Sequence, residues 1–120
     1  MKLSEILCIL EAEQINLVDQ SVLEKEYCFI SATDLMSDAL AMVCAKSEET
    51  LLLTGLANAQ TLRTAEVLDI DCVILVRNKK ILHSDIEIEH GMSVNLFTTH
   101  YSMYEACGLM YQSGLKTATK

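Results

Sequence analysis

The stretch "CVILV", residues 72–76, decides the fold of this chain. Five consecutive apolar residues are typical of a strand that is covered on both faces, so we expect this strand to lie at the centre of a sheet. Three similar segments, "YCFIS" (27–31), "TLLLT" (50–54) and "VNLF" (94–97), predict further strands, and the segment 94–97 is expected to be the last of them. A shorter apolar run, "INLV" (15–18), predicts one more strand near the N-terminus.

Segments with helical periodicity lie between these strands and at both ends of the chain. Ser4 is expected to cap the first helix, Asp34 the second and Asn58 the third, because their side-chain oxygens can accept hydrogen bonds from free backbone N–H groups. The apolar faces of these three helices comprise Leu3, Ile6, Leu7 and Leu10, then Leu35, Met36, Ala39, Leu40 and Val43, and finally Leu62, Ala65 and Leu68.

Two capping boxes predict two more helices towards the C-terminus. Ser84 and Glu87 open a short helix that ends at Gly91, although alternating Ile86 and Ile88 would also suit a strand. The final helix opens with Ser102 and Glu105 and ends near Gly114. Its apolar face comprises Met103, Ala106, Cys107 and Met110.

From residue 27 onward strands and helices alternate, which favours right-handed crossovers and a parallel sheet. We therefore predict an α/β fold with three α/β/α layers, in which a mostly parallel sheet of about five strands carries helices on both faces. The 120 residues fit one domain over 1–120. A chain of this length can bury roughly two thirds of its unfolded surface around a single core.

The charge of the chain argues against several classes of partner. Seventeen acidic and nine basic side chains give a formal net charge of -8, which opposes binding to nucleic acid or to an acidic membrane surface. No apolar run approaches the roughly 18 residues of a membrane span, and Glu5 interrupts the segment where a signal peptide would stay apolar. We expect a cytoplasmic protein.

Five cysteines are spread along the chain without the close pairs that zinc and iron–sulfur sites normally use. Cys8, Cys28, Cys44 and Cys72 lie in apolar runs, where free cysteine behaves as a small buried hydrophobic residue. We therefore expect structural roles for these residues and no cofactor.

Polar segments follow the four main strands at 31–34, 54–58, 77–80 and 98–102. Because the carboxyl ends of parallel strands share one edge of a sheet, where such folds bind ligands, we expect a binding site at this rim. Its candidate ligand-binding residues are Asp34, Thr54, Gly55, Asn58, Arg77, Asn78, Thr98, Thr99 and His100.

Asp34 and Asp38 stand where a strand gives way to a helix and allow three interpretations. Capping and the helix dipole explain both carboxylates without a ligand. Alternatively, the two carboxylates hold a divalent metal ion together with His100, since hard ions prefer oxygen ligands. The third interpretation is recognition of a hydroxyl or amine of a ligand.

The turn Arg77–Lys80 is the only strongly basic segment. It is either a solvated turn or an anion contact, for a nucleotide phosphate or an acidic partner, in which Arg77 could bind two oxygens at once. His100 and Ser102 could suggest a base with its nucleophile, but the capping box with Glu105 explains Ser102 better.

Five segments of the chain resemble the DRTGG-type domain, a small module that is found beside CBS pairs in a class of pyrophosphatases. They are "KLSEI" (2–6), "SATDLMSDAL" (31–40), "TLLLTGLAN" (50–58), "DCVILVRNKK" (71–80) and "SVNLFTTHYSMYEACGLMY" (93–111). The Arg-Thr-Gly-Gly signature that names the family is missing, because the region before the second strand reads "DQSVLEKEYCFIS" (19–31). The fold is also similar to the N-terminal domain of HPr kinase. In that enzyme the chemistry belongs to a separate C-terminal domain that carries a P-loop.

The resemblance implies a non-catalytic regulatory or scaffold module that forms homodimers and binds a small ligand or a protein partner at the strand-end rim. It implies no catalytic residue. For the dimer interface we expect Met103, Tyr104 and Tyr111, since tyrosine buries area and keeps a polar tip. Two alternatives stay open: a nucleotide sensor that uses Arg77–Lys80, and a small metal-dependent enzyme that uses Asp34, Asp38 and His100.

Overall fold

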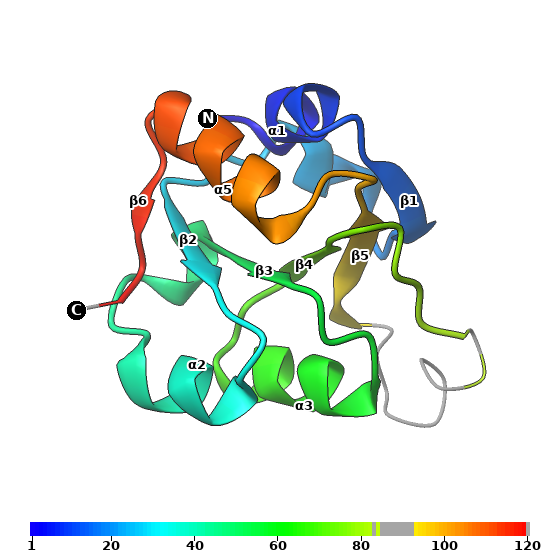
Figure 1. Cartoon of the computed structure of the whole chain (residues 1–120), viewed down its shortest axis with the longest axis vertical. Helices are drawn as coiled ribbons and strands as arrows, with labels where there is room; N and C mark the ends of the chain where they lie inside the picture. The colour runs from blue at the N-terminus through cyan, green and yellow to red at the C-terminus, as the bar shows by residue number, and fades with distance from the viewer. Residues whose placement is uncertain (83, 85–92, 120) are drawn as a thin grey trace.

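A computed structural model describes residues 1–82, 84 and 93–119 (Figure 1). Six strands form one sheet in the order β1-β5-β4-β3-β2-β6. Their bounds are β1 (Glu13–Asn16), β2 (Phe29–Ala32), β3 (Thr50–Thr54), β4 (Cys72–Leu75), β5 (Asn95–Thr98) and β6 (Lys116–Thr117). All neighbouring strands run parallel except β1, which pairs with β5 in the antiparallel direction.

The predicted centre of the sheet is confirmed. Every residue of β3 and β4 is buried, as expected for unbroken apolar runs that are covered on both faces. The sheet has six strands rather than about five, and the strand at 94–97 is not the last one, because the two-residue β6 follows it and pairs with β2. So short an element carries no periodicity that a sequence pattern could reveal.

The helices lie on both faces of the sheet, which confirms the three layers (Figure 1). On one face, α1 (Leu3–Ile9) and α5 (Met103–Gln112) cover a core that includes Leu51, Ile74 and Phe97. On the other face, α2 (Met36–Met42) and α3 (Ala59–Val67) cover a core that includes Leu52, Val73 and Leu96. Two short 3-10 helices, η1 (Gln20–Glu24) and η2 (Ser47–Glu49), complete the described elements.

Some of the expected helix starts are confirmed and others are wrong. Asn58 caps α3 by accepting hydrogen bonds from Gln60 N–H and Thr61 N–H, and Ser102 forms the expected capping box with Glu105. Ser4 does not cap α1, because it lies inside that helix and Lys2 is the N-cap residue. The helix expected over 83–91 falls almost wholly outside the described residues.

The apolar face of α2 is narrower than expected. Met36 and Ala39 are buried, but Leu35 and Leu40 are 56% and 47% exposed, because α2 is a short helix of seven residues that faces the sheet with one side only. Of the cysteines in apolar runs, Cys72 is buried, whereas Cys8 and Cys44 are exposed, which corrects the expectation of burial for those two.

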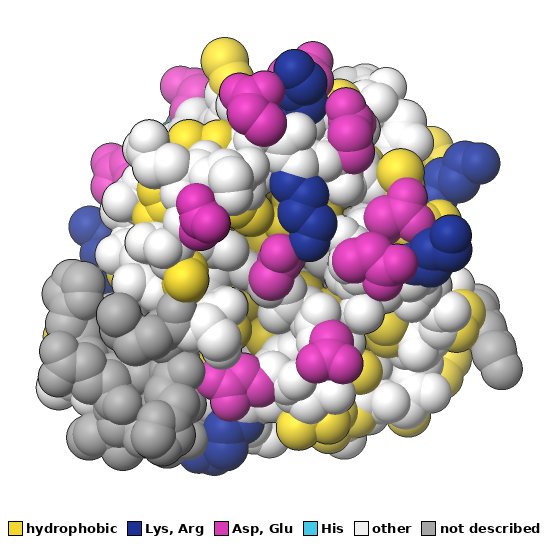
Figure 2. Space-filling model, turned by 180° about the vertical axis from the view of Figure 1, so that it is seen from behind, with side chains coloured by type: hydrophobic (Ala, Val, Ile, Leu, Met, Phe, Trp, Pro, Cys, Tyr) yellow, Lys and Arg dark blue, Asp and Glu magenta, His cyan; other side chains and the backbone are white. Residues whose placement is uncertain are grey.

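Acidic side chains are spread over the face of the molecule that is turned away in Figure 1, with Lys and Arg side chains among them (Figure 2). This distribution agrees with the net charge of -8. Within the described ranges, every helix is too short or too polar to span a lipid bilayer.

Candidate functional site

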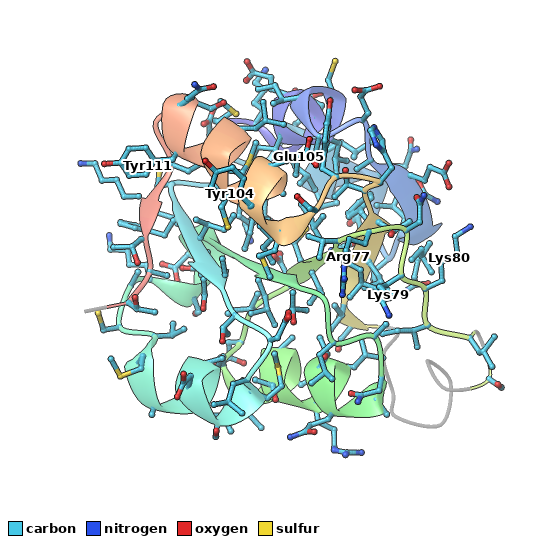
Figure 3. All side chains as sticks on the ribbon, in the orientation of Figure 1. Arg77, Lys79, Lys80, Tyr104, Glu105 and Tyr111 are labelled. Carbon is cyan, nitrogen blue, oxygen red and sulfur yellow. The ribbon has the colours of Figure 1, made fainter. Side chains whose placement is uncertain are left out.

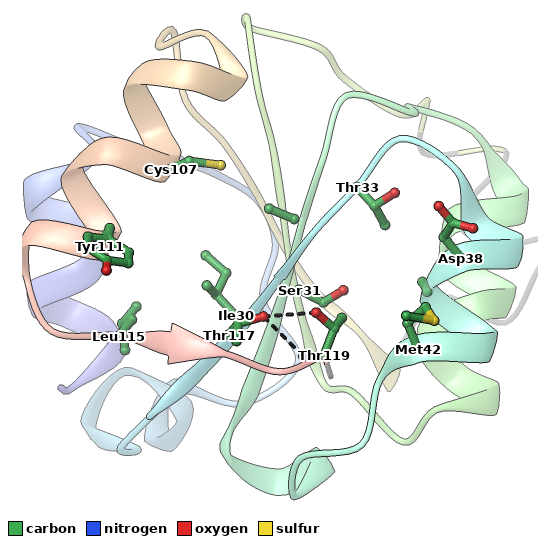
Figure 4. A pocket seen from close by; sticks show the side chains of 12 residues that line it. Ile30, Ser31, Thr33, Asp38, Met42, Cys107, Tyr111, Leu115, Thr117 and Thr119 are labelled. Atoms are coloured by element: carbon green, nitrogen blue, oxygen red, sulfur yellow. Dashed lines mark hydrogen bonds between the residues drawn. The ribbon is translucent and has the colours of Figure 1, made fainter.

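A cavity lies at the edge of the sheet beside β2, between α2 on one side and α5 on the other (Figure 4). We call it the β2 pocket. Its volume of about 460 Å³ falls within the range of small-molecule sites. β6 pairs with β2 only at Phe29 and Ile30, so within the described residues the outer edge of β2 beyond Ile30 has no neighbouring strand, and the pocket lies there.

The C-terminal segment closes one side of the β2 pocket. Gly114, with φ 96°, turns the chain back from the end of α5 towards β6, a conformation that glycine adopts without strain. Beyond β6 the segment crosses to the end of α2, where Cys44 N–H donates to the carbonyl of Ala118 at 2.9 Å and Val43 bridges Thr119. The pocket wall is therefore tied to both helical layers.

Ser31 is the most informative residue of the β2 pocket. It lines the pocket and is 1% exposed, and its Oγ has no hydrogen-bond partner within the described structure. A buried hydroxyl without a partner is uncommon and destabilises the folded state by roughly 1–3 kcal/mol. A ligand in the pocket would supply the missing partner.

Further hydroxyl groups line the β2 pocket. The Oγ1 atoms of Thr117 and Thr119 lie 2.9 Å apart and share one hydrogen bond (Figure 4). Thr33 Oγ1 accepts a hydrogen bond from Leu35 N–H at 3.1 Å, just before α2 begins. These groups keep unused hydrogen-bonding capacity, since each hydroxyl offers one donor and two acceptor sites.

The charge within the β2 pocket is negative. Asp38, in the first turn of α2, contributes the one carboxylate, and the described lining contains no Lys, Arg or His. Apolar side chains of Ile30, Met42 and Leu115 form much of the remaining surface. Cys107 also lines the pocket, and burial raises the pKa of its thiol, so it is not an activated nucleophile.

The structure confirms that the carboxyl ends of β2 to β5 share one edge of the sheet, but many of the polar groups there bind one another. Asp34 Oδ1 accepts a hydrogen bond from Gly55 N–H at 2.6 Å and a longer one from the Thr54 hydroxyl at 3.4 Å. Asp34 does not cap α2, whose N-cap residue is Leu35. Its carboxylate holds two neighbouring loops together instead.

The basic turn Arg77–Lys80 is also hydrogen-bonded to a neighbouring loop at this edge of the sheet. Arg77 and Asn78 have φ values of 55° and 56°, as in a type I′ turn, and their N–H groups donate to the carbonyls of Tyr101 and Thr99. Thr99 Oγ1 donates to the carbonyl of Leu10. The structure thus brings Arg77, Asn78 and Thr99 together through backbone contacts, and the Arg77 side chain is exposed.

His100 lies on a different part of the rim. Its Nε2 is 3.7 Å from Glu11 Oε2, and its ring lies against that of Tyr101. The proposed metal ligands Asp34, Asp38 and His100 are therefore not brought into one cluster. Over residues 1–82, 84 and 93–119, no group of three or more His, Cys, Asp or Glu side chains is arranged to hold a metal ion.

Thr98 is the second buried hydroxyl without a partner in the described part of the chain, and it is 1% exposed. It does not line the β2 pocket. None of the candidate rim residues lines this pocket, but Asp38, which was considered with Asp34 as a metal or ligand contact, does. The pocket is formed by Ser31, Thr33 and Asp38 of the strand–helix junction together with residues of α5 and the C-terminal segment.

A separate polar cluster lies at the opposite end of the sheet and serves the fold. Tyr27 is buried, and its hydroxyl donates to Asp71 Oδ1 at 2.7 Å, while Lys25 Nζ lies 2.7 Å from Asp71 Oδ2. Burial is the main cause that raises the pKa of Tyr27 far above its ordinary value, so the phenol stays protonated.

Comparisons with known proteins show a solved structure with a similar fold. No protein-family model and no curated protein matches the chain. A solved structure does match: the CBS and DRTGG domains of the regulatory region of Clostridium perfringens pyrophosphatase, complexed with the activator diadenosine tetraphosphate. The TM-score is 0.68 at 18% sequence identity, and the match covers 93% of this chain.

The chain has a DRTGG-type fold. At this level of identity the likeness concerns the fold alone, and it confirms the resemblance that the sequence segments predicted. The match covers 46% of the pyrophosphatase fragment, so the chain spans about half of its length. The similarity of the DRTGG-type fold to the N-terminal domain of HPr kinase stays a prediction.

Proposed function

We propose that this DRTGG-type chain is a regulatory module that binds a small organic ligand in the β2 pocket and catalyses no reaction itself. The buried Ser31 hydroxyl, which lines a cavity of about 460 Å³ and lacks a partner among the described residues, is the observation that carries this proposal. Four other hydroxyl-bearing residues and one carboxylate surround the same cavity, as in sites that combine apolar walls with a few polar groups.

Two further observations support a binding role rather than catalysis. Ser31 Oγ has no base within hydrogen-bond distance in the described structure, and the thiol of Cys107 is held in its neutral form by burial. The similar pyrophosphatase fragment is a regulatory region that was solved with an activator. That fragment was solved in complex with the activator diadenosine tetraphosphate, and we extend only the idea of regulation by a small ligand to this chain.

A thermal-shift panel tests the proposal. Wild type, Ser31→Ala and Arg77→Ala would be heated with nucleosides, nucleotides including diadenosine tetraphosphate, amino acids, amines and sugars. A ligand of the β2 pocket raises the melting temperature of wild type and of Arg77→Ala but not of Ser31→Ala. The proposal fails if every stabilising compound acts equally on Ser31→Ala and wild type.

The same panel tests the alternative of a nucleotide sensor. Arg77, Lys79 and Lys80 are exposed on the turn after β4, on a different element from those that form the β2 pocket (Figure 3). A nucleotide held by this turn would stabilise Ser31→Ala and lose its effect in Arg77→Ala. Alanine at position 77 adopts the same positive φ as arginine with a similar strain, so the variant changes the charge and not the turn.

We also propose that the module forms homodimers through α5. Tyr104 and Tyr111 lie two turns apart on this helix and are 88% and 84% exposed, with Gly108 between them (Figure 3). Met103 is partly buried against the core at the start of the helix. Light scattering after size-exclusion chromatography would show a dimer for wild type and a monomer for Tyr104→Glu, whereas a monomeric wild type at tens of micromolar refutes this part.

A further inference from the structure

The polar groups and charges of the β2 pocket indicate which ligands it can bind. This step rests on the proposed function, because it concerns the same pocket. We propose that the ligand is a small organic cation: an amine carried on an apolar body. Its ammonium group would lie between Asp38 and Ser31, and its apolar part would lie against the side chains on the α5 side.

Charge is the first argument. Asp38 is exposed at the pocket, and no cationic side chain in the described lining balances it. The chain as a whole carries a net charge of -8, which adds to the negative potential. An anionic ligand would therefore be repelled by the Asp38 carboxylate and would find only hydroxyl groups as side-chain donors. An ammonium ion, in contrast, is attracted by the carboxylate and can donate hydrogen bonds to the hydroxyl oxygens.

Hydrogen bonding is the second argument. An ammonium group has three donors and no acceptor, so it needs oxygen atoms that accept. The Ser31 hydroxyl has both lone pairs free of partners in the described structure, and the Asp38 carboxylate accepts without donating. Thr33 Oγ1 already accepts one hydrogen bond from Leu35 N–H and retains a second lone pair.

The shape of the pocket explains the apolar body. Asp38 and Met42 lie on the α2 side of β2, and Tyr111 and Leu115 lie on the side of α5 (Figure 4). A ligand that reaches both sides must cross the edge of β2 past Ile30. Ile30 and Leu115 offer an apolar surface there to an aliphatic or aromatic body.

Three compounds of nearly equal size test the inference: 2-phenylethylamine, 2-phenylethanol and phenylacetate, titrated into the full chain and followed by amide NMR shifts. For fragments of this size we expect a dissociation constant on the order of a millimolar for the amine. The amine should bind more tightly than the alcohol, and phenylacetate should bind most weakly. Added salt should weaken only the amine, because Asp38 is exposed to solvent.

Asp38→Asn should weaken amine binding about tenfold, because a charge-assisted hydrogen bond becomes a neutral one. Asp69→Asn is the matched control: it makes the same change of net charge at an exposed residue that does not line the pocket. We expect it to leave amine binding unchanged. Both sites are exposed, so loss of folding is not an expected complication.

The outcomes separate this inference from the proposed function. The inference is overturned if the alcohol or the carboxylate binds as tightly as the amine, or if Asp38→Asn binds the amine like wild type. It is also overturned if the amine does not bind while another compound stabilises the chain in a Ser31-dependent way, and in that case the proposed function stands. If no compound gives a Ser31-dependent response, both fail.

Discussion

Replacing the two partnerless hydroxyl groups tests the physical observation behind the β2 pocket. Thr98→Val exchanges the Thr98 hydroxyl for a methyl group of similar size, so packing is kept while the desolvation penalty of the hydroxyl is removed. With a penalty of roughly 1–3 kcal/mol for such a group, we expect Thr98→Val to stabilise the chain by about 1–2 kcal/mol. For a domain of this size that corresponds to a rise of roughly 3–5 °C in melting temperature per kcal/mol.

Ser31→Ala should stabilise the ligand-free chain less, by about 0–1 kcal/mol, because the smaller alanine side chain leaves a small void. Urea unfolding of wild type and both variants, with the slope of each transition compared, measures the differences. The reasoning is refuted if both variants are less stable than wild type by about 1 kcal/mol or more, since the hydroxyls would then have partners in the folded chain.

Three further predictions concern contacts that hold the fold. Tyr27→Phe removes the hydrogen bond to the Asp71 carboxylate. Because this bond is charge-assisted, we expect urea unfolding to show that the free energy of unfolding falls by about 1.5 kcal/mol. An unchanged midpoint would contradict the contact. Asn58→Ala removes the cap of α3 and should cost about 1 kcal/mol by the same assay, while Asn58→Asp, which keeps an acceptor, should cost clearly less. The hydrogen bond from the Tyr101 hydroxyl lowers the pKa of Glu11 below its ordinary value of 4.5, because it stabilises the ionised carboxylate. This contact therefore stabilises the folded chain fully above pH 4.5, and its contribution is lost as the pH falls through the lower pKa of the folded state. Tyr101→Phe should remove this part of the pH dependence of stability. The melting temperatures of both proteins would be measured between neutral pH and pH 3, and a difference that stays constant over this range would contradict the prediction.

The layers and the centre of the sheet could be predicted because burial on both faces leaves a clear pattern in the sequence. The runs at 51–53 and 72–76 are apolar throughout, and the strands β3 and β4 that contain them are buried along their whole length. The caps Asn58 and Ser102 could be predicted because their hydrogen bonds join residues only two or three positions apart. Contacts of this range depend on local sequence and not on the tertiary fold.

The features that could not be predicted depend on contacts between distant residues. β6 exists because Lys116 and Thr117 meet β2, more than eighty positions away in the sequence. Asp34 has the residue type of a helix cap, but its carboxylate accepts a hydrogen bond from Gly55 N–H instead. The helix α2 therefore begins two residues later, at Met36. Local preference was outweighed by a tertiary contact in this case.

The rim at the carboxyl ends of the strands stays a prediction as a ligand site, and the pocket that the structure shows beside β2 is lined by other residues. The polar rim was expected to offer its side chains to a ligand, yet Thr99 and the backbone of Asn78 are used to join its loops to each other. The β2 pocket instead depends on α5 and the C-terminal segment, whose approach to β2 has no local signal. Ser31 did carry a signal, because it is a hydroxyl residue in a strand that is otherwise apolar.

Cys107 provides the most direct measurement of whether a ligand occupies the β2 pocket. Its thiol lines the pocket, whereas the exposed thiol of Cys8 lies on α1 and serves as an internal control. Alkylation rates of both residues would be measured by mass spectrometry with and without a compound that stabilises the chain in the thermal-shift panel. We predict that the compound slows the modification of Cys107 and leaves that of Cys8 unchanged; equal rates at Cys107 with and without the compound would contradict a ligand site in this pocket.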